Sequence, residues 1–224
     1  WTALRDPERY RRLLAVNGQL FVRTLALLAS LAFFTAQGAR QSELVLAANA
    51  LLMNLLMATS YGLDGFAHAV EALSGRHLGA GDRGAFRRTL HSAALFSLAT
   101  AGTFTGLFLV AGAQVIALLT DITAVRELAS IYLPWLTALP LIAVWCYLFD
   151  GLAIGVTETG IMRDSMLASA FLVYLPLWWL TQEWGNDGLW LALLAFFAAR
   201  GVTLGGALWR CGVLSAQSDF FARG

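Results

Sequence analysis

The chain has 224 residues, of which 58% are hydrophobic and only 13% carry a charge. A soluble domain has about a quarter charged residues, so this composition indicates an integral membrane protein. The formal net charge of +1 provides no basic surface for a nucleic-acid partner. The first residue is Trp1 rather than Met, from which we expect a fragment or a processed chain.

Long uncharged runs separated by short polar linkers predict an all-α protein, because about 20 apolar residues cross a hydrocarbon core as a helix. We expect a cytoplasmic interfacial linker over residues 1–12, in which Asp6 caps a helix that begins at Pro7. One six-helix transmembrane lobe follows over 13–209, and residues 210–224 form a cytoplasmic tail. The predicted spans are 13–36, 44–72, 89–119, 130–156, 162–181 and 188–209.

The arginines predict the orientation, because basic residues concentrate on the cytoplasmic side of a membrane. Arg40 and Arg126 lie on one side of the predicted spans. The other side, which we assign to the cytoplasm together with both chain ends, has Arg5, Arg9, Arg11, Arg12, Arg76, Arg83, Arg87, Arg88, Arg163, Arg210 and Arg223. An aromatic belt at the opposite interface is expected from Trp178, Trp179, Trp184 and Trp190.

The apolar stretch 44–71 carries a polar stripe. Its positions follow one another in steps of three and four: Asn54, Met57, Tyr61, Asp64, His68 and Glu71. This spacing places them along one face of a helix, and ionisable groups there are costly in lipid, so the face should meet protein or water. We interpret Asn54, Tyr61, His68 and Glu71 as lining a cavity. The alternative is that His68 and Glu71 are solvated at the cytoplasmic interface.

The pattern around Asp64 occurs twice. Tyr61-x-x-Asp64-Gly65 recurs 86 residues later as Tyr147-x-x-Asp150-Gly151. A glycine after each aspartate would let another helix backbone approach closely. The repeat suggests one functional cavity that Tyr147 also lines, although short apolar words can also match by chance.

Four charges lie inside the predicted spans: Arg23, Asp64, Asp150 and Arg200. At ~1.5 Å per residue from the cytoplasmic ends they reach comparable depths, so either arginine can pair with either aspartate. One interpretation is a set of ion pairs that only fixes helix packing. The other is an ion- or proton-coupling site at Asp150 and Asp64, with Arg23 and Arg200 as counter-charges.

The sequence predicts no catalytic residues and no metal site. His68, His77 and His91 lack the spacing of metal ligands, and no nucleophile stands with a histidine and an acid. We therefore expect neither an enzyme nor a bound cofactor.

Several short motifs together resemble the multidrug and toxic compound extrusion (MATE) family. The resemblance runs over residues 13–208, and the pair Arg23-Thr24 is similar to the DinF-type branch. The motifs are LAAN (46–49), DGFA (64–67), EALSG (71–75), LGAGD (78–82), FDGLAIG (149–155), MRD (162–164), GLWL (188–191) and Arg200.

This resemblance implies the C-terminal lobe of a twelve-helix transporter in a bacterial inner membrane, with the N-terminal lobe as its partner. Such proteins export organic cations and other amphiphiles in exchange for H⁺ or Na⁺. Asp150 matches the family's acidic position on the tenth helix, implicated in cation coupling, and Asp64 matches the DinF-like pattern on the eighth. The first span carries Arg23 and no acidic residue, which favours H⁺ over Na⁺.

Three functions follow as hypotheses. The first is half of an H⁺-coupled multidrug antiporter. The second is a flippase for a lipid-linked substrate, which would use Arg23 and Arg200 to bind a pyrophosphate headgroup. The third is a membrane bundle that transports nothing and serves as an assembly domain, against which the two intramembrane aspartates argue.

Overall fold

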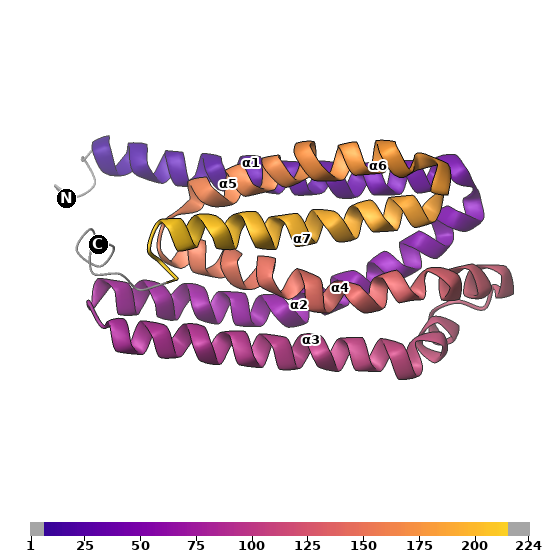
Figure 1. Ribbon diagram of the computed structural model, residues 1–224, viewed down its shortest axis with the longest axis horizontal. Coiled ribbons are helices and arrows are strands. Elements are labelled where there is room, and N and C mark those ends of the chain that lie inside the picture. The colour runs from indigo at the N-terminus through magenta and orange to yellow at the C-terminus, as the bar shows by residue number, and fades with distance from the viewer. Residues whose placement is uncertain (1–6, 215–224) are drawn as a thin grey trace.

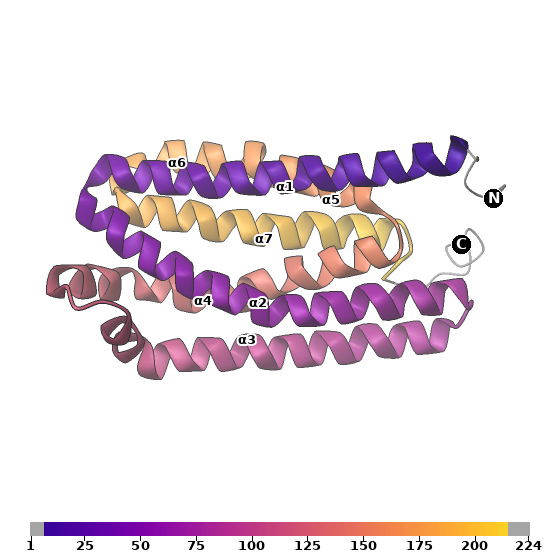
Figure 2. The ribbon, with the colours of Figure 1, turned by 180° about the vertical axis from the view of Figure 1, so that it is seen from behind.

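The computed structural model describes residues 7–214, which are almost entirely helical and contain no strand. The long helices run along one axis as a bundle (Figures 1 and 2), which confirms the predicted all-α fold. In chain order the elements are α1 (Pro7–Gln41), α2 (Glu43–Gly79), α3 (Arg83–Leu119), α4 (Thr123–Gly155), α5 (Thr159–Ala168), the π-helix η2 (Ser169–Tyr174), α6 (Leu175–Thr181), the 3₁₀-helix η3 (Gln182–Trp184) and α7 (Asn186–Arg210).

Five helices are long and apolar enough to cross a membrane, and each coincides with a predicted span. They are Leu13–Gln41, Glu43–Gly79, Arg83–Leu119, Thr123–Gly155 and Asn186–Arg210. The fifth predicted span, 162–181, is made of α5, η2 and α6, which follow one another without a break. The π-helical segment divides this span into pieces of 10, 6 and 7 residues, but together they cover roughly 30 Å.

The helices extend beyond most of the predicted bounds because their caps lie in the linkers. Ser42 Oγ accepts a hydrogen bond from the Val45 amide at 3.1 Å, and α2 begins directly after it. Asp82 Oδ1 accepts from the Ala85 amide at 2.8 Å and caps α3. The first polar residues of these spans are therefore helical.

The predicted end segments are only partly described. Residues 7–12, expected to form a separate linker, are the first turns of α1 and continue into the span. Asp6, the expected cap, lies outside the described residues, as do Arg5 and Arg223. Of the expected tail, Arg210 ends α7 and residues 211–214 form a turn.

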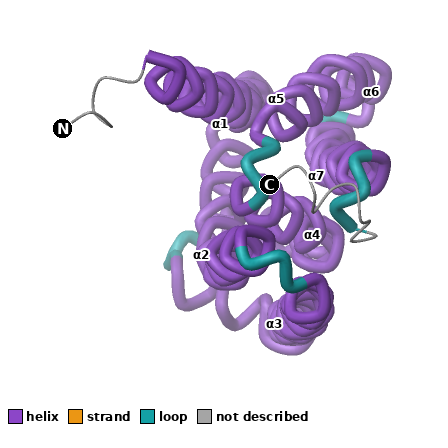
Figure 3. The backbone as a smooth tube through the Cα atoms, turned by 90° about the vertical axis from the view of Figure 1, so that its left-hand side faces the viewer, coloured by secondary structure: helices purple, strands orange, loops and turns teal. Residues whose placement is uncertain are grey.

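Helix α4 lies between α2, α3 and α7 and packs against all three (Figure 3). Its contact with α2 is backbone to backbone. A Cβ on Gly151 would collide with the backbone of Ala67, and a Cβ on Gly155 would collide with the backbone of Glu71. The predicted close approach thus occurs at Gly151. It was wrong for Gly65, where a Cβ would meet no atom within 4 Å.

The beginning of α1 and the end of α7 lie at the same end of the bundle, as do the arginine-rich end of α2 and the start of α3 (Figure 1). Toward this end α1 and α2 diverge, whereas at the other end they follow one another directly. The expected aromatic belt was wrong for Trp190, which is fully buried, while Trp179 and Trp184 are each 63% exposed. Trp178 is partly buried and packs edge-on against Phe33.

Candidate ion-coupling site

The carboxylate of Asp150 joins three helices. Asp150 lies on α4, and its Oδ2 accepts hydrogen bonds from Arg23 on α1 and from Arg200 on α7, the latter at 2.6 Å. The sequence places Arg23, Arg200 and both aspartates at comparable depths, so it does not predict which aspartate each arginine contacts. In the structure both guanidinium groups meet the same oxygen of Asp150.

The two arginines differ in their surroundings. Arg200 is 2% exposed, and its guanidinium carbon lies 5.7 Å and 5.8 Å from the ring centres of Phe196 and Phe197. The faces of aromatic rings attract a cation, so these apolar surroundings still stabilise the charge of the Arg200 guanidinium. The side chain of Arg23 is 21% exposed, and its Nε is buried without a hydrogen-bond partner among the described residues. Arg23 is therefore the less tightly held of the pair.

A cavity of about 130 Å³ lies beside this cluster, between α1, α2, α4 and α7. It is lined by Arg23, Leu27, Leu31, Met53, Leu56, Met57, Ser60, Tyr61, Asp64, Tyr147, Phe197 and Arg200. The two tyrosines of the internal repeat and Asp64 thus share one cavity with both intramembrane arginines. Asp150 is not one of the lining residues, but it pairs with both of these arginines.

Asp64 differs from Asp150 in having no bound partner. It lies on α2, is half-buried, and has no hydrogen bond or ion pair within residues 7–214. It is nevertheless close enough to interact electrostatically with His68 on its own helix and with Arg23, Asp150 and Arg200. Across the cavity, the hydroxyls of Tyr147 and Ser60 share a hydrogen bond of 2.5 Å. The cavity therefore offers one carboxylate without a partner among the described residues, surrounded by aromatic and apolar side chains and by two arginines that are paired with Asp150.

The residues of the predicted polar stripe on α2 do not all line the same cavity. Tyr61 and Asp64 line it, but Asn54 lies in a separate pocket of about 350 Å³ between α1 and α2. His68 is on the outside, its side chain 79% exposed, and its Nδ1 lies 3.4 Å from Glu71 Oε2. Asn54 thus belongs to a different pocket from Tyr61 and Asp64, and His68 and Glu71 lie on the outer surface of this half, so a cavity lined by these three residues stays a prediction.

The physical reason is helical drift. The five steps from Asn54 to Glu71 cover 17 residues and average 3.4, whereas an α-helix has 3.6 residues per turn. From Asn54 to Glu71 the stripe consequently turns by roughly 100° around α2. Its far end also lies where α1 and α2 have diverged (Figure 2).

Sequence reasoning missed a buried amide network at the opposite end of the bundle. Asn49 on α2 and Asn186 on α7 exchange two hydrogen bonds of 2.7 Å and 2.9 Å, and the indole of Trp190 donates to Asn49 Oδ1 at 2.9 Å. All three residues are buried. The signal in the sequence is Asn49, a polar residue inside an apolar run, which the sequence analysis uses only as part of the LAAN motif.

A family model described as MatE matches residues 20–180 of the chain. The chain is 45% identical to the DNA damage-inducible protein F of Escherichia coli (strain K12) over 202 residues, which is 90% of the chain and 43% of that relative. It is 24% identical over 204 residues to the chloroplastic protein DETOXIFICATION 44 of Arabidopsis thaliana, covering 91% of the chain and 39% of the relative.

Solved structures show the same fold. A mutant of the Vibrio cholerae MATE transporter VcmN superposes with a TM-score of 0.86 at 20% identity over 99% of this chain and 50% of that chain. The eukaryotic MATE transporter AtDTX14 gives 0.73 at 17% identity over 87% of this chain and 44% of that chain. The chain thus spans about half the length of the proteins it matches.

Proposed function

The chain belongs to the MatE family of membrane transporters, and we propose that it is the C-terminal, six-helix half of a proton-coupled antiporter that exports organic cations and amphiphiles. The observation that carries this proposal is the shared carboxylate of Asp150 beside the unpaired carboxylate of Asp64. The N-terminal lobe would complete the cavity, because the side chain of Tyr61 at its wall is 74% exposed. Both ends of the chain would be cytoplasmic, in a bacterial inner membrane.

Asp64 would be the residue at which substrate and proton exchange. Its ionised carboxylate, with the rings of Tyr61 and Tyr147 nearby, can attract an organic cation through charge and through aromatic faces. Once protonated, it carries no charge and attracts the cation less. A proton arriving from outside would therefore displace the substrate.

Asp150 would be the residue that links protonation to helix packing. When ionised, it holds Arg23 on α1 and Arg200 on α7 to α4. A proton on Asp150 would remove the charge that both arginines share and leave the two cations to repel each other. The less buried Arg23 would then separate and let α1 move, and such a shift between two packings is what alternating access requires.

The same geometry favours H⁺ over Na⁺. A hard metal cation needs several oxygen ligands, and Asp150 already accepts from two guanidinium groups. The lipid-linked flippase needs arginines free to bind a pyrophosphate, whereas both intramembrane arginines are paired with Asp150. This pairing removes the main support for that alternative.

The test is drug efflux by the intact transporter, driven by a pH gradient in membrane vesicles without Na⁺. Asp64→Asn keeps the shape of the side chain and breaks no bond that the structure describes, so it should abolish coupled efflux while the protein still folds. Asp121→Asn is the matched control, because Asp121 is fully exposed at the other end of the bundle and its ion pair with Arg126, at 3.2 Å, lies on the surface. Wild-type efflux in the Asp64→Asn variant would refute the proposal, as would efflux driven equally well by Na⁺ alone.

A further inference from the structure

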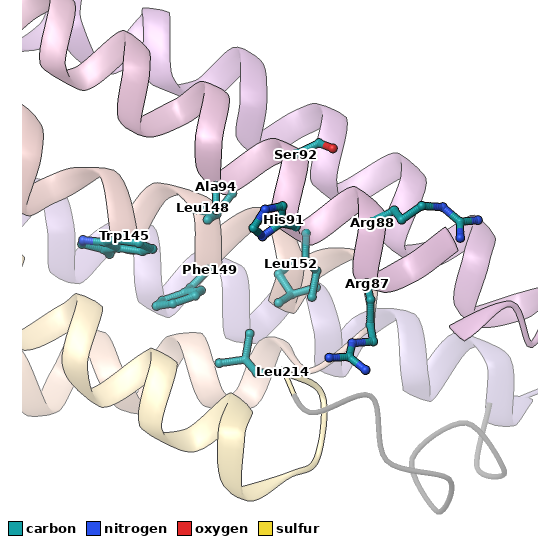
Figure 4. A pocket seen from close by; sticks show the side chains of 11 residues that line it. Arg87, Arg88, His91, Ser92, Ala94, Trp145, Leu148, Phe149, Leu152 and Leu214 are labelled. Atoms are coloured by element: carbon teal, nitrogen blue, oxygen red, sulfur yellow. The ribbon is translucent and has the colours of Figure 1, made fainter. Parts of the chain in front are cut away.

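A groove of about 590 Å³ runs along the outside of the bundle, away from the charged cavity. It lies between the first turns of α3, the last turns of α4 and the turn that follows α7 (Figure 4). None of the helix faces that line it contributes to the cavity beside Asp64. The groove is therefore a separate structural feature from that cavity.

One end of this groove is basic. Arg87, Arg88 and His91 on α3 are exposed and line it; Figure 4 shows Arg87 extending from α3 toward Leu214 and Arg88 extending away from Leu214. Neither arginine has an ion pair or hydrogen bond within the part of the chain that the structure describes. Because α3 begins at Arg83, these guanidinium groups leave the helix roughly 6–8 Å along its axis, at a depth that suits the headgroup region.

The other wall of the groove is apolar and aromatic. Trp145, Phe149 and Leu152 follow each other in steps of four and three, so they lie on one face of α4. The rings of Trp145 and Phe149 have centres 6.1 Å apart and are tilted by 32°. Trp145 is 38% exposed, although it lies well inside the span. The groove thus passes from two exposed arginines to an apolar trough parallel to the helices.

We propose that this groove binds an anionic phospholipid, whose phosphate contacts Arg87 beside the positive charge of Arg88 and whose acyl chain lies against Trp145, Phe149 and Leu152. Basic pockets between membrane helices at a headgroup interface attract lipids of net negative charge. A zwitterionic lipid has the same acyl chains but no net charge to match the arginines. The charge complementarity and the direction of the trough therefore select the anionic lipid, independently of the proposed transport function.

Native mass spectrometry of the intact protein tests this by titration with phosphatidylglycerol and with phosphatidylcholine of the same acyl chains. Each arginine near an anionic headgroup contributes about five-fold in affinity, so the Arg87→Gln/Arg88→Gln protein should bind phosphatidylglycerol ~25-fold more weakly. Its affinity for phosphatidylcholine should not change. The control is Arg11→Gln/Arg76→Gln, which removes two exposed arginines from the same end of the bundle but outside the groove.

Trp145→Ala tests the tail contact, and it should weaken long-chain phosphatidylglycerol while leaving the headgroup preference intact. Wild-type affinity in the Arg87→Gln/Arg88→Gln protein would overturn the proposal. So would an equal loss in the control, which would mean a general effect of surface charge. Displacement of the lipid by inorganic phosphate alone would assign the basic end to free phosphate instead.

Discussion

Replacing Asp150 by Asn should destabilise the bundle, because it removes the charge that two arginines share. Both guanidinium groups hydrogen-bond to one oxygen, so their nitrogen atoms are at most about 6 Å apart. Two like charges at that distance repel by roughly 3 kcal/mol at an effective dielectric constant of about 20. Arg200, only 2% exposed, would also lose its counter-charge. Together these effects agree with the loss of about 3–5 kcal/mol typical of a broken buried ion pair.

The assay is equilibrium unfolding of the intact protein in mixed micelles. Adding Arg23→Gln to Asp150→Asn should restore part of the lost free energy of unfolding, because one of the two repelling cations is gone. Asp121→Asn should stay within about 0.5 kcal/mol of wild type, as expected for an exposed position. Wild-type stability of the Asp150→Asn protein, or a double variant weaker than Asp150→Asn, would refute this reasoning.

Two further predictions concern packing. Gly151→Ala should destabilise the fold or prevent expression, because its Cβ would collide with the backbone of Ala67. Gly65→Ala should be tolerated, because its Cβ meets open space. The yield of folded protein from both variants checks this, and equal yields would contradict the close approach of α2 and α4. Asn49→Ala should cost about 2–4 kcal/mol, because it leaves Asn186 buried with its amide unpaired. Unfolding in micelles measures that loss, and a stability unchanged from wild type would contradict the network.

The spans were predictable from the sequence because long apolar runs have few structural solutions in a membrane. Helix ends were not, since Ser42 and Asp82 place the caps inside the polar linkers. The composition of the fifth span also does not indicate that a π-helical segment divides it. Its π-helical segment, Ser169–Tyr174, packs against α7, and the Tyr174 hydroxyl donates to the Ser30 carbonyl on α1 at 3.4 Å.

The charged residues of the candidate site were predictable from the sequence, but the ion pairs between them were not. Charged residues in apolar runs identified Arg23, Asp64, Asp150 and Arg200, because such residues are costly in lipid. Depth along a helix gives the level of a side chain but not the direction in which it points. Whether Asp64 or Asp150 would hold the arginines therefore depended on the crossing of α2 and α4.

The most direct test of the central claim is the proton released when substrate binds. The purified intact transporter, in weakly buffered Na⁺-free solution below neutral pH, should release protons when a saturating organic cation is added, because cation and proton compete for Asp64. The Asp64→Asn variant should release none, and the Asp121→Asn control should behave as wild type. Substrate binding without proton release in the wild-type protein would contradict the account.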